Sequence, residues 1–170
     1  MNNVIFKTVI LFISLIGINS FGQQTDLSSQ EIQDMKFMLE EEKVARDVYD
    51  LLDQQWDMRV FNNIKGSEQR HMDMMENLLN SYKIAYQLSN EKGIFYNQEL
   101  QNLYNSLVEK GTKSKYDALE VGKLIEITDI ADLETAIQQA TESEIKDVYS
   151  KLIFASNNHL KAFNRNLSRF

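Results

Sequence analysis

The sequence contains no cysteine, no proline and only two histidines, His71 and His159, among its 170 residues. Without cysteine the chain forms no disulfide, no zinc finger and no cysteine-ligated iron cluster, and it cannot use a thiol nucleophile. Average proline usage is about 5%, so several prolines would be expected in a chain of this length. Because proline interrupts helix interiors, its absence favours long, continuous helices.

Basic residues are also fewer than acidic residues. The chain has 18 Lys plus Arg against 25 Asp plus Glu, and no basic block. Binding to a phosphate backbone depends on clustered Lys and Arg, so we expect no nucleic-acid partner. The length is that of one domain with a sizeable hydrophobic core.

The N-terminal segment differs in composition from the rest. Residues 1–22 hold a single charge, Lys7, then an apolar stretch from Thr8 to Ile18 and the small residues Ser20 and Gly22. This pattern is typical of a secretory signal peptide, and we expect cleavage before Gln23. The apolar stretch is shorter than the roughly 20 residues of a membrane-spanning helix, so we predict no membrane span. The expected organisation is a signal peptide at 1–22 and one domain at 23–170, in the periplasm or secreted.

The spacing of apolar residues predicts four long helices in this domain. Their expected limits are a capping box at Ser28–Glu31 to about Gln55, about Asn62 to Tyr82, Ser114 to about Ala140, and a cap at Thr141–Glu144 to near Ser168. Residues 83–113 are less regular, contain a short helix closed by Gly111, and can carry the chain from one end of a bundle to the other. The predicted fold is all-α, a four-helix bundle with a long crossover that contains a short helix between the second and third long helices.

Carboxylates and a histidine share one height in the first helix pair. In an antiparallel pair, residues equally far from the connecting turn lie level along the bundle. This places Glu42 level with Glu68 and His71. Glu68 and His71 are three residues apart among apolar neighbours, so both side chains are expected to enter the core.

The second helix pair has a matching polar layer. By the same argument Glu126 lies level with His159, and Asp129 lies level with Ser156. Burying several carboxylates requires a compensating positive charge. Arg46 is the only obvious basic residue on these faces, so metal ions are the better source of that charge.

Four-helix bundles that bind two iron or manganese ions use one Glu from each of two helices and a Glu-x-x-His from each of the other two. Five of these six roles have a residue here: Glu42, Glu68, His71, Glu126 and His159. The sixth position, three residues before His159, is Ser156. We hypothesise that Asp129 supplies the missing carboxylate from the neighbouring helix.

These runs resemble the ferritin-like superfamily, and rubrerythrin in particular. Residues 42–49 are similar to the rubrerythrin pattern Glu-x-x-Ala-Arg-x-x-Tyr, residues 68–71 to its Glu-x-x-His, and residues 155–163 to its Ala-x-x-x-His-x-x-x-Phe. More closely, residues 40–49, 60–73, 118–133 and 158–163 resemble the uncharacterised bacterial and archaeal family called domain of unknown function 2202.

The resemblance implies a ferritin-like bundle with a dinuclear metal site, with iron as the expected metal. It assigns Glu42, Glu68, His71, Glu126 and His159 as ligands, and Ser156 departs from the rubrerythrin pattern. Rubrerythrin's separate cysteine-ligated iron domain has no counterpart here, so a peroxidase would need an external electron donor.

Several other residues leave alternatives open. Tyr49 lies on the same face as Glu42 and could donate to a ligand, act as a redox-active phenol or simply pack in the core. Arg46 could pair with a ligand carboxylate or with Glu42. We expect solvated faces for six acidic residues: Glu40, Glu41, Asp47, Asp73, Glu76 and Glu120. The methionines Met72, Met74 and Met75 are expected to fill the core rather than bind Cu(I).

The leading functional hypothesis is redox chemistry at a carboxylate-bridged metal pair, either oxidation of Fe(II) or reduction of oxygen or peroxide. Iron or manganese suits the mixed carboxylate and imidazole ligands, and zinc or copper is also compatible. The alternative is a metal-binding or structural domain without catalysis, so enzymatic activity stays open. Association with further copies of the chain also stays open.

Overall fold

The computed structural model describes residues 27–170, which form five α-helices and no strand. The helices are α1 (Ser29–Trp56), α2 (Arg59–Ser81), α3 (Gln98–Gly111), α4 (Lys115–Gln139) and α5 (Ser143–Leu167). The predicted all-α class is confirmed. The predicted signal peptide at 1–22 lies outside the described residues.

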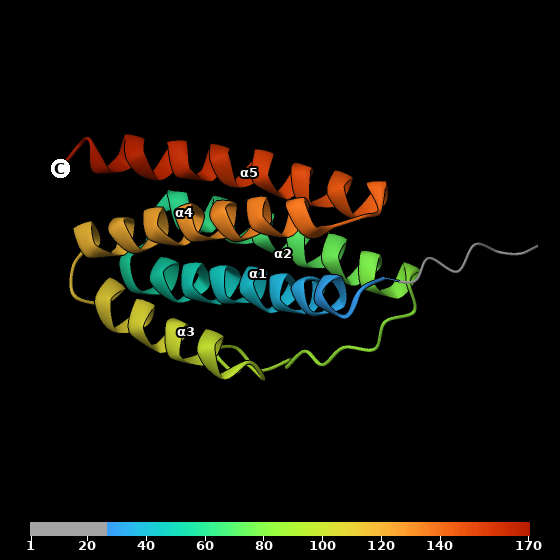
Figure 1. Ribbon diagram of the computed structural model, residues 1–170. Coiled ribbons are helices and arrows are strands. Elements are labelled where there is room, and N and C mark those ends of the chain that lie inside the picture. The colour runs from blue at the N-terminus through green and yellow to red at the C-terminus, as the bar shows by residue number, and fades with distance from the viewer. Residues whose placement is uncertain (1–26) are drawn as a thin grey trace, which may run out of the picture.

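The long helices pack on one another in a closed ring. α1 pairs with α2 and α4 pairs with α5, while α1 also packs on α4 and α2 on α5. Figure 1 shows that residues 82–97 leave the end of α2 and run back along α1, and that α3 then continues to the opposite end of the bundle, where α4 begins. No helix among residues 27–170 has the length and apolar character that crossing a membrane requires.

Side-chain hydrogen bonds to the backbone cap the N-termini of α1 and α4. The predicted capping box is present, because Ser28 Oγ accepts from the Glu31 N–H and the Glu31 carboxylate accepts from the Ser28 N–H. Ser114 caps α4, because its Oγ accepts from the Asp117 N–H. α2 begins at Arg59 rather than near Asn62, because Asp57 turns the chain at once with a φ of 49°.

The predicted cap at Thr141 is wrong. The residue before α5 is Glu142, and its side chain makes no capping hydrogen bond. Thr141 instead donates from its N–H and its Oγ1 to Glu31 Oε1, at 2.7 and 2.8 Å. Glu31 therefore joins the first turn of α1 to the connection between α4 and α5.

Polar side chains of α1 hold the crossover in place. Lys43 is fully buried, and its Nζ donates to Asp47 Oδ2 and to the backbone oxygens of Glu91 and Ile94. The Glu40 carboxylate accepts the backbone N–H groups of Tyr96 and Asn97, at 2.7 and 2.9 Å.

The predicted solvated faces are therefore wrong for three residues. Glu40, Glu41 and Asp47 have exposed fractions of only 6%, 6% and 2%. Helical spacing alone predicts that the far side of α1 faces water, whereas the crossover and α3 cover it. Of the other acidic residues with this prediction, Asp73 is exposed, while Glu76 and Glu120 are half-buried.

The hydrophobic core has two halves. One half contains Tyr49, Phe61 and Phe163, whose ring centroids lie 5.4 to 5.9 Å apart. The other half contains the predicted core methionines Met72 and Met75, with Met74 packed at its edge. Close packing of this kind resists changes in side-chain volume.

Gly122 is required where α4 approaches α5. A Cβ added at Gly122 would overlap the Phe163 ring. We expect Gly122→Ala to lower the free energy of unfolding by about 1–3 kcal/mol, because the ring must shift in a packed core. Urea unfolding measures the change.

Gly66→Ala is the matched control. A Cβ added at Gly66, inside α2, has no atom within 4 Å. Alanine there should be neutral or stabilise by up to about 1 kcal/mol. If both variants unfold at the wild-type midpoint, the close contact between α4 and α5 is not as described.

Candidate metal centre

A polar layer divides the two apolar halves of the core at one height on all four long helices. On α1 and α4 the layer residues Glu42, Glu126 and Asp129 lie between segments that belong to different halves of the core. The same division occurs at Glu68 and His71 on α2, and at Ser156 and His159 on α5. All seven residues of the layer are buried.

Two groups of ligand atoms meet within this layer. One group consists of Glu42, Glu68 and His71, and the other of Glu68, Glu126 and His159. Within each group, one potential ligand atom from every residue lies within 4.8 Å of the other two. Either group has the size and donor types of a site for one metal ion.

Glu68 belongs to both groups and turns a different oxygen toward each. Its Oε2 lies 2.8 Å from His71 Nδ1, and its Oε1 lies 2.9 Å from His159 Nδ1. Glu42 Oε2 lies 3.1 Å from His71 Nδ1, and Glu126 Oε2 lies 3.4 Å from His159 Nδ1. The site is therefore nearly symmetric about the Glu68 carboxylate.

The two imidazole rings stack across the middle of the layer. Their centroids are 5.5 Å apart, with an angle of 21° between the ring planes. Since His71 comes from α2 and His159 from α5, this contact joins the two helix pairs. In both residues Nδ1 faces the carboxylates.

Several of these buried atoms have no hydrogen-bond partner within the described part of the chain. They include Glu42 Oε1, Glu68 Oε1 and His159 Nδ1. The last two atoms are close to each other, yet their alignment does not make a hydrogen bond. Unpartnered buried donors and acceptors are costly, and one cation in each of the two groups would give these atoms partners. The donor set thus fits metal binding.

The pKa shifts of the layer residues also indicate that the layer needs positive charge. Burial raises the pKa of Glu42 to about 8, although His71 opposes the shift. Burial and the negative charge of Glu68 raise the pKa of Glu126 to about 7. Burial lowers the pKa of His71, but Glu42 and Glu68 outweigh it and raise that pKa to about 11. In the absence of metal, protons therefore supply the positive charge that the layer needs.

Tyr49 is in contact with this layer. It is fully buried, and its hydroxyl donates to Glu126 Oε1 at 2.7 Å and lies 3.3 Å from the Gly122 carbonyl oxygen. Of the roles open to Tyr49, the structure thus shows both a hydrogen bond to a candidate ligand and aromatic packing against Phe61 and Phe163.

Asp129 and Ser156 are the residues that the sequence associates with the sixth ligand position, and both are buried in the layer. Asp129 is buried, and burial together with the nearby charge of Glu42 raises its pKa. Its ligand atoms fall in neither group of three, so it lies beside the two groups rather than within them. The Ser156 hydroxyl donates to the Leu152 carbonyl oxygen at 3.1 Å.

Arg46 makes no hydrogen bond or ion pair with the described residues of the layer. Its guanidinium donates to Asp47 Oδ1 and to Gln69 Oε1, so both predicted pairings, with a ligand carboxylate or with Glu42, are wrong. The buried cation of α1 is Lys43, which faces the crossover. Sequence spacing did not predict its burial, because two of its three oxygen partners are backbone atoms of an irregular segment.

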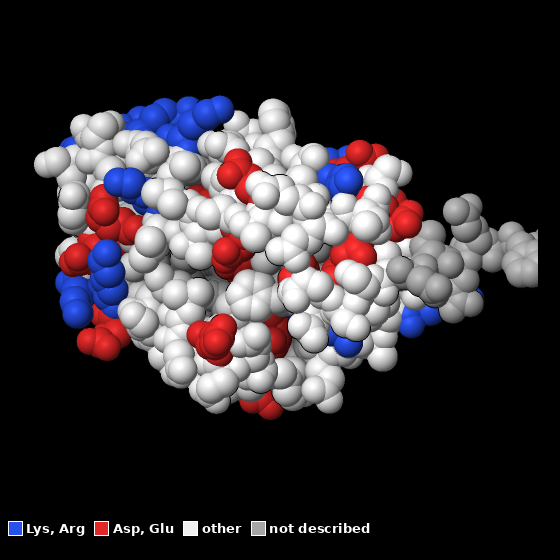
Figure 2. Space-filling view, in the orientation of Figure 1, with Lys and Arg blue, Asp and Glu red and all other residues white. Residues whose placement is uncertain are grey.

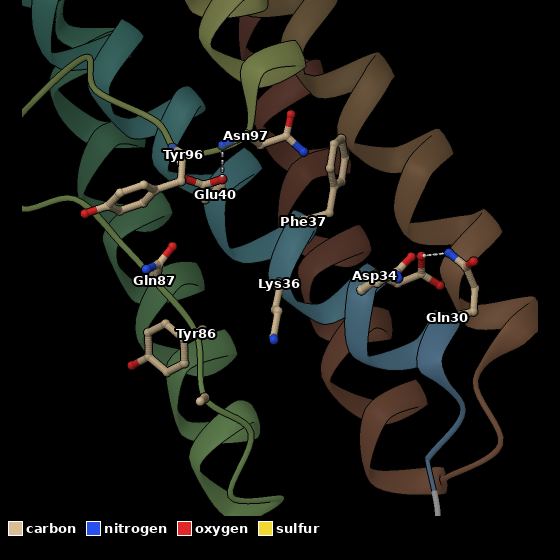
Figure 3. Close-up of a pocket in the computed structure, with 11 residues that line it drawn as sticks. Gln30, Asp34, Lys36, Phe37, Glu40, Tyr86, Gln87, Tyr96 and Asn97 are labelled. Carbon is tan, nitrogen blue, oxygen red and sulfur yellow. Dashed lines mark hydrogen bonds between the residues drawn. The ribbon is translucent and has the colours of Figure 1, made fainter.

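A surface groove of about 650 Å³ lies elsewhere, between the N-terminal half of α1 and residues 85–97. Figure 3 shows Phe37 and Lys36 of α1 on one side of this groove and Tyr86 and Gln87 on the other. No candidate ligand lines the groove, so it is separate from the polar layer.

Comparison with known proteins finds a matching family and a relative of similar sequence. The model of the family described as "Uncharacterized protein domain (DUF2202)" matches residues 31–169. The uncharacterized protein MJ0754 of Methanocaldococcus jannaschii is 46% identical over 154 residues, which are 90% of this chain and 83% of that protein.

Two solved structures are similar in fold. The crystal structure of hypothetical protein MJ0754 from Methanococcus jannaschii has a TM-score of 0.83 and 46% identity, covering 84% of this chain and 82% of that one. A DUF305 fragment from Deinococcus radiodurans has a TM-score of 0.67 at 14% identity, covering 84% of this chain and 98% of the fragment. The second likeness concerns the fold alone.

We expect the metal-free protein to lose stability between about pH 5 and about pH 8. The pKa values of Glu42 and Glu126 lie above the ordinary value of 4.5, so the folded chain keeps protons that the unfolded chain has released. Unfolding therefore becomes more favourable as the pH rises. Denaturant unfolding with a chelator, at a series of pH values, measures the slope.

Glu126→Gln removes one of the responsible groups while keeping an acceptor for Tyr49. Its stability should fall less steeply over the same pH range, by on the order of 1–3 kcal/mol in total. The half-buried Glu120, on the same helix, serves as the control through Glu120→Gln, which should keep the wild-type slope. Stability that rises with pH in the metal-free wild type would contradict this account.

Proposed function

The chain belongs to the DUF2202 family, and we propose that it is a ferritin-like protein whose long helices hold two metal ions, with iron as the expected metal. The proposed activity is redox chemistry at this pair, either oxidation of Fe(II) or reduction of oxygen or peroxide. Export to the periplasm or the exterior is part of the proposal and rests on the composition of residues 1–22.

The observation that carries the proposal is the position of Glu68. One carboxylate lies between two groups of ligand atoms and offers a separate oxygen to each. A carboxylate in that position can bridge two metal ions and keep them close together. A site for a single ion has no need of two histidines on opposite sides of one glutamate.

The other residues supply the remaining ligands and their orientation. His71 and Glu42 would hold one ion, and His159 and Glu126 the other. Tyr49 fixes the orientation of Glu126 by its hydrogen bond. The charge of Glu42 helps to raise the pKa of the buried Asp129, so Asp129 is a candidate proton acceptor beside the centre. The apolar core on both sides of the layer limits the access of water.

When bound, the metal ions would supply the electrons and polarise the oxidant. Reduction of oxygen to hydrogen peroxide, or of peroxide to water, takes two electrons and two protons, and a pair of Fe(II) ions would supply the two electrons. The chain has no cysteine for an iron-sulfur group. An external electron donor would therefore have to restore Fe(II) in a catalytic cycle.

Ser156 supports a second candidate function. It stands where the sixth carboxylate of a symmetric site would be, and its hydroxyl is already engaged with a backbone oxygen. With one carboxylate fewer, the centre could hold one ion more tightly than the other. The protein would then bind or buffer metal, or use one ion structurally, without turnover.

Metal stoichiometry and reactivity distinguish these functions. We expect anaerobic titration with Fe(II) or Co(II) to saturate at two ions per chain, and oxygen to convert the iron form to an absorbing ferric form. Glu68→Gln should lose tight binding of both ions, because the shared carboxylate serves both groups. Asp73→Asn, an exposed change of equal charge on the same helix, should bind like wild type.

Saturation at one ion, or two bound irons that oxygen leaves unchanged, would favour metal binding without catalysis. Wild type and Glu68→Gln with the same weak binding would show that the layer is no metal centre. Circular dichroism on each variant separates lost binding from lost folding.

Tyr49→Phe tests the hydrogen bond to Glu126. The ring stays in its aromatic cluster, while Glu126 loses its donor. We expect metal stoichiometry to be kept and affinity or oxidation rate to fall about 10–100-fold, as for other residues that orient metal ligands. Competition with a coloured chelator measures the affinity. If neither quantity changes, Tyr49 serves packing alone.

A further inference from the structure

Four buried methionines lie in one half of the core, beside the polar layer. They are Met35 and Met38 on α1 and Met72 and Met75 on α2, and each has an exposed fraction of at most 3%. Within residues 27–170, the other half of the core contains no buried methionine, and only Met58 packs at its edge. The thioethers are therefore concentrated on one side of the layer.

Three of these methionines stand one helical turn from a candidate ligand. Each is four residues from its ligand in the chain, in the pairs Met38 with Glu42, Met72 with Glu68, and Met75 with His71. Side chains four residues apart lie on the same face of a helix, with Cβ atoms about 5–6 Å apart. Because all three methionines belong to the same half of the core, they lie on the same side of the layer.

Met38 also reaches the surface. It lines a depression of about 180 Å³ between α1 and α4, together with Asp34 and Asp132. Met38 thus stands one turn from Glu42 and at the wall of this depression. A small molecule that passes between the layer and the depression would meet the Met38 sulfur.

Negative charge at the depression affects which oxidants can pass it. The part of the lining that the structure describes has two Asp and neither Lys nor Arg. Figure 2 shows Asp and Glu along the middle of one face, whereas Lys and Arg gather mainly at one end and along the edge formed by α5. Carboxylates repel anions such as superoxide, whereas hydrogen peroxide carries no charge.

Packing alone does not require methionine at these positions. Leu39 and Leu79 are buried in the same half of the core. Leucine and methionine have similar volumes and replace each other in a core at small cost. The property that methionine adds is its sulfur atom, which oxidants convert to a sulfoxide.

The reaction of a thioether with hydrogen peroxide needs no further reactant. The O–O bond breaks, one oxygen forms a bond to sulfur, and the other leaves as water with both hydrogens of the peroxide. The sulfur loses two electrons and the peroxide gains them. Hydrogen peroxide is also the product when oxygen takes two electrons, which is one of the reactions proposed for the metal centre.

We propose that Met38, Met72 and Met75 are oxidation sites that take up hydrogen peroxide formed at the metal centre. The inference rests on the proposed function, because the centre must supply the peroxide. Oxygen transfer to sulfur would remove peroxide before it attacks the imidazole ligands or leaves the protein. Since a sulfoxide is polar, each transfer would also weaken the apolar core, so the protection is self-limiting.

Mass spectrometry of peptides tests the position of the oxidation. Protein loaded anaerobically with Fe(II) is exposed to oxygen with catalase present, which removes peroxide from the bulk solution. We expect one added oxygen about tenfold more often on Met38, Met72 and Met75 than on the half-buried Met58 and Met74. Hydrogen peroxide added to metal-free protein should give the opposite order, because Met58 and Met74 are the more exposed residues.

Variants separate the source of the peroxide from its target. Glu68→Gln, treated in the same way, should show no added oxygen on the buried methionines, whereas Asp73→Asn should behave like wild type. A variant with Leu at Met38, Met72 and Met75 should keep its fold, which thermal unfolding checks, and its metal stoichiometry. Without catalase it should release more peroxide than wild type for the same amount of iron oxidised.

The outcomes distinguish this inference from the proposed function. Iron oxidised by oxygen with the three methionines unmodified, or equal peroxide release by wild type and the leucine variant, would overturn the oxidation sites and leave the centre intact. Equal oxidation of the buried methionines in wild type and Glu68→Gln would also overturn them, because the oxidant would then come from the solution. Absence of iron oxidation by wild type would remove the redox activity and the oxidation sites together.

Discussion

The cost of burying negative charge dominates this structure. Carboxylates from three helices and histidines from two meet in one layer, with apolar core on both sides and little access to water. Such a layer is stable only if positive charge enters it, as protons on the histidines and carboxyls or as metal ions. The long helices bring these groups to one height, and the aromatic cluster around Tyr49 keeps the layer oriented.

The polar residues of α1 divide into three groups by the direction in which they point. Glu42 faces the candidate metal centre, Glu40, Lys43 and Asp47 hold the crossover, and Glu41 faces α4. Consecutive residues on a helix point about 100° apart, so one charged run can serve three neighbours. This explains why residues 38–45 of α1 are buried without interruption although half of them are charged.

The sequence predicted well which residues meet in the polar layer, because helix geometry is regular. Without proline the helices stay continuous, and short connections within each pair let simple counting place Glu42 beside His71 and Glu126 beside His159. The burial of Glu40, Lys43 and Asp47 could not be predicted, because the backbone groups that they bind in the crossover lie about fifty residues away in an irregular segment that has no period. Thr141 was misassigned for a similar reason, since its partner Glu31 is distant in the chain.

The histidine contact between α2 and α5 has a further consequence for a chain without cysteine. Ions held by Glu68, His71 and His159 would join the first helix pair to the second and close a chain loop over residues 42–159. A cross-link that closes a long loop restricts the unfolded chain, as a disulfide does. The bound ions would then act as a reversible cross-link. The stability of the protein would depend on the local supply of metal, whereas the stability that a disulfide gives depends on an oxidising environment.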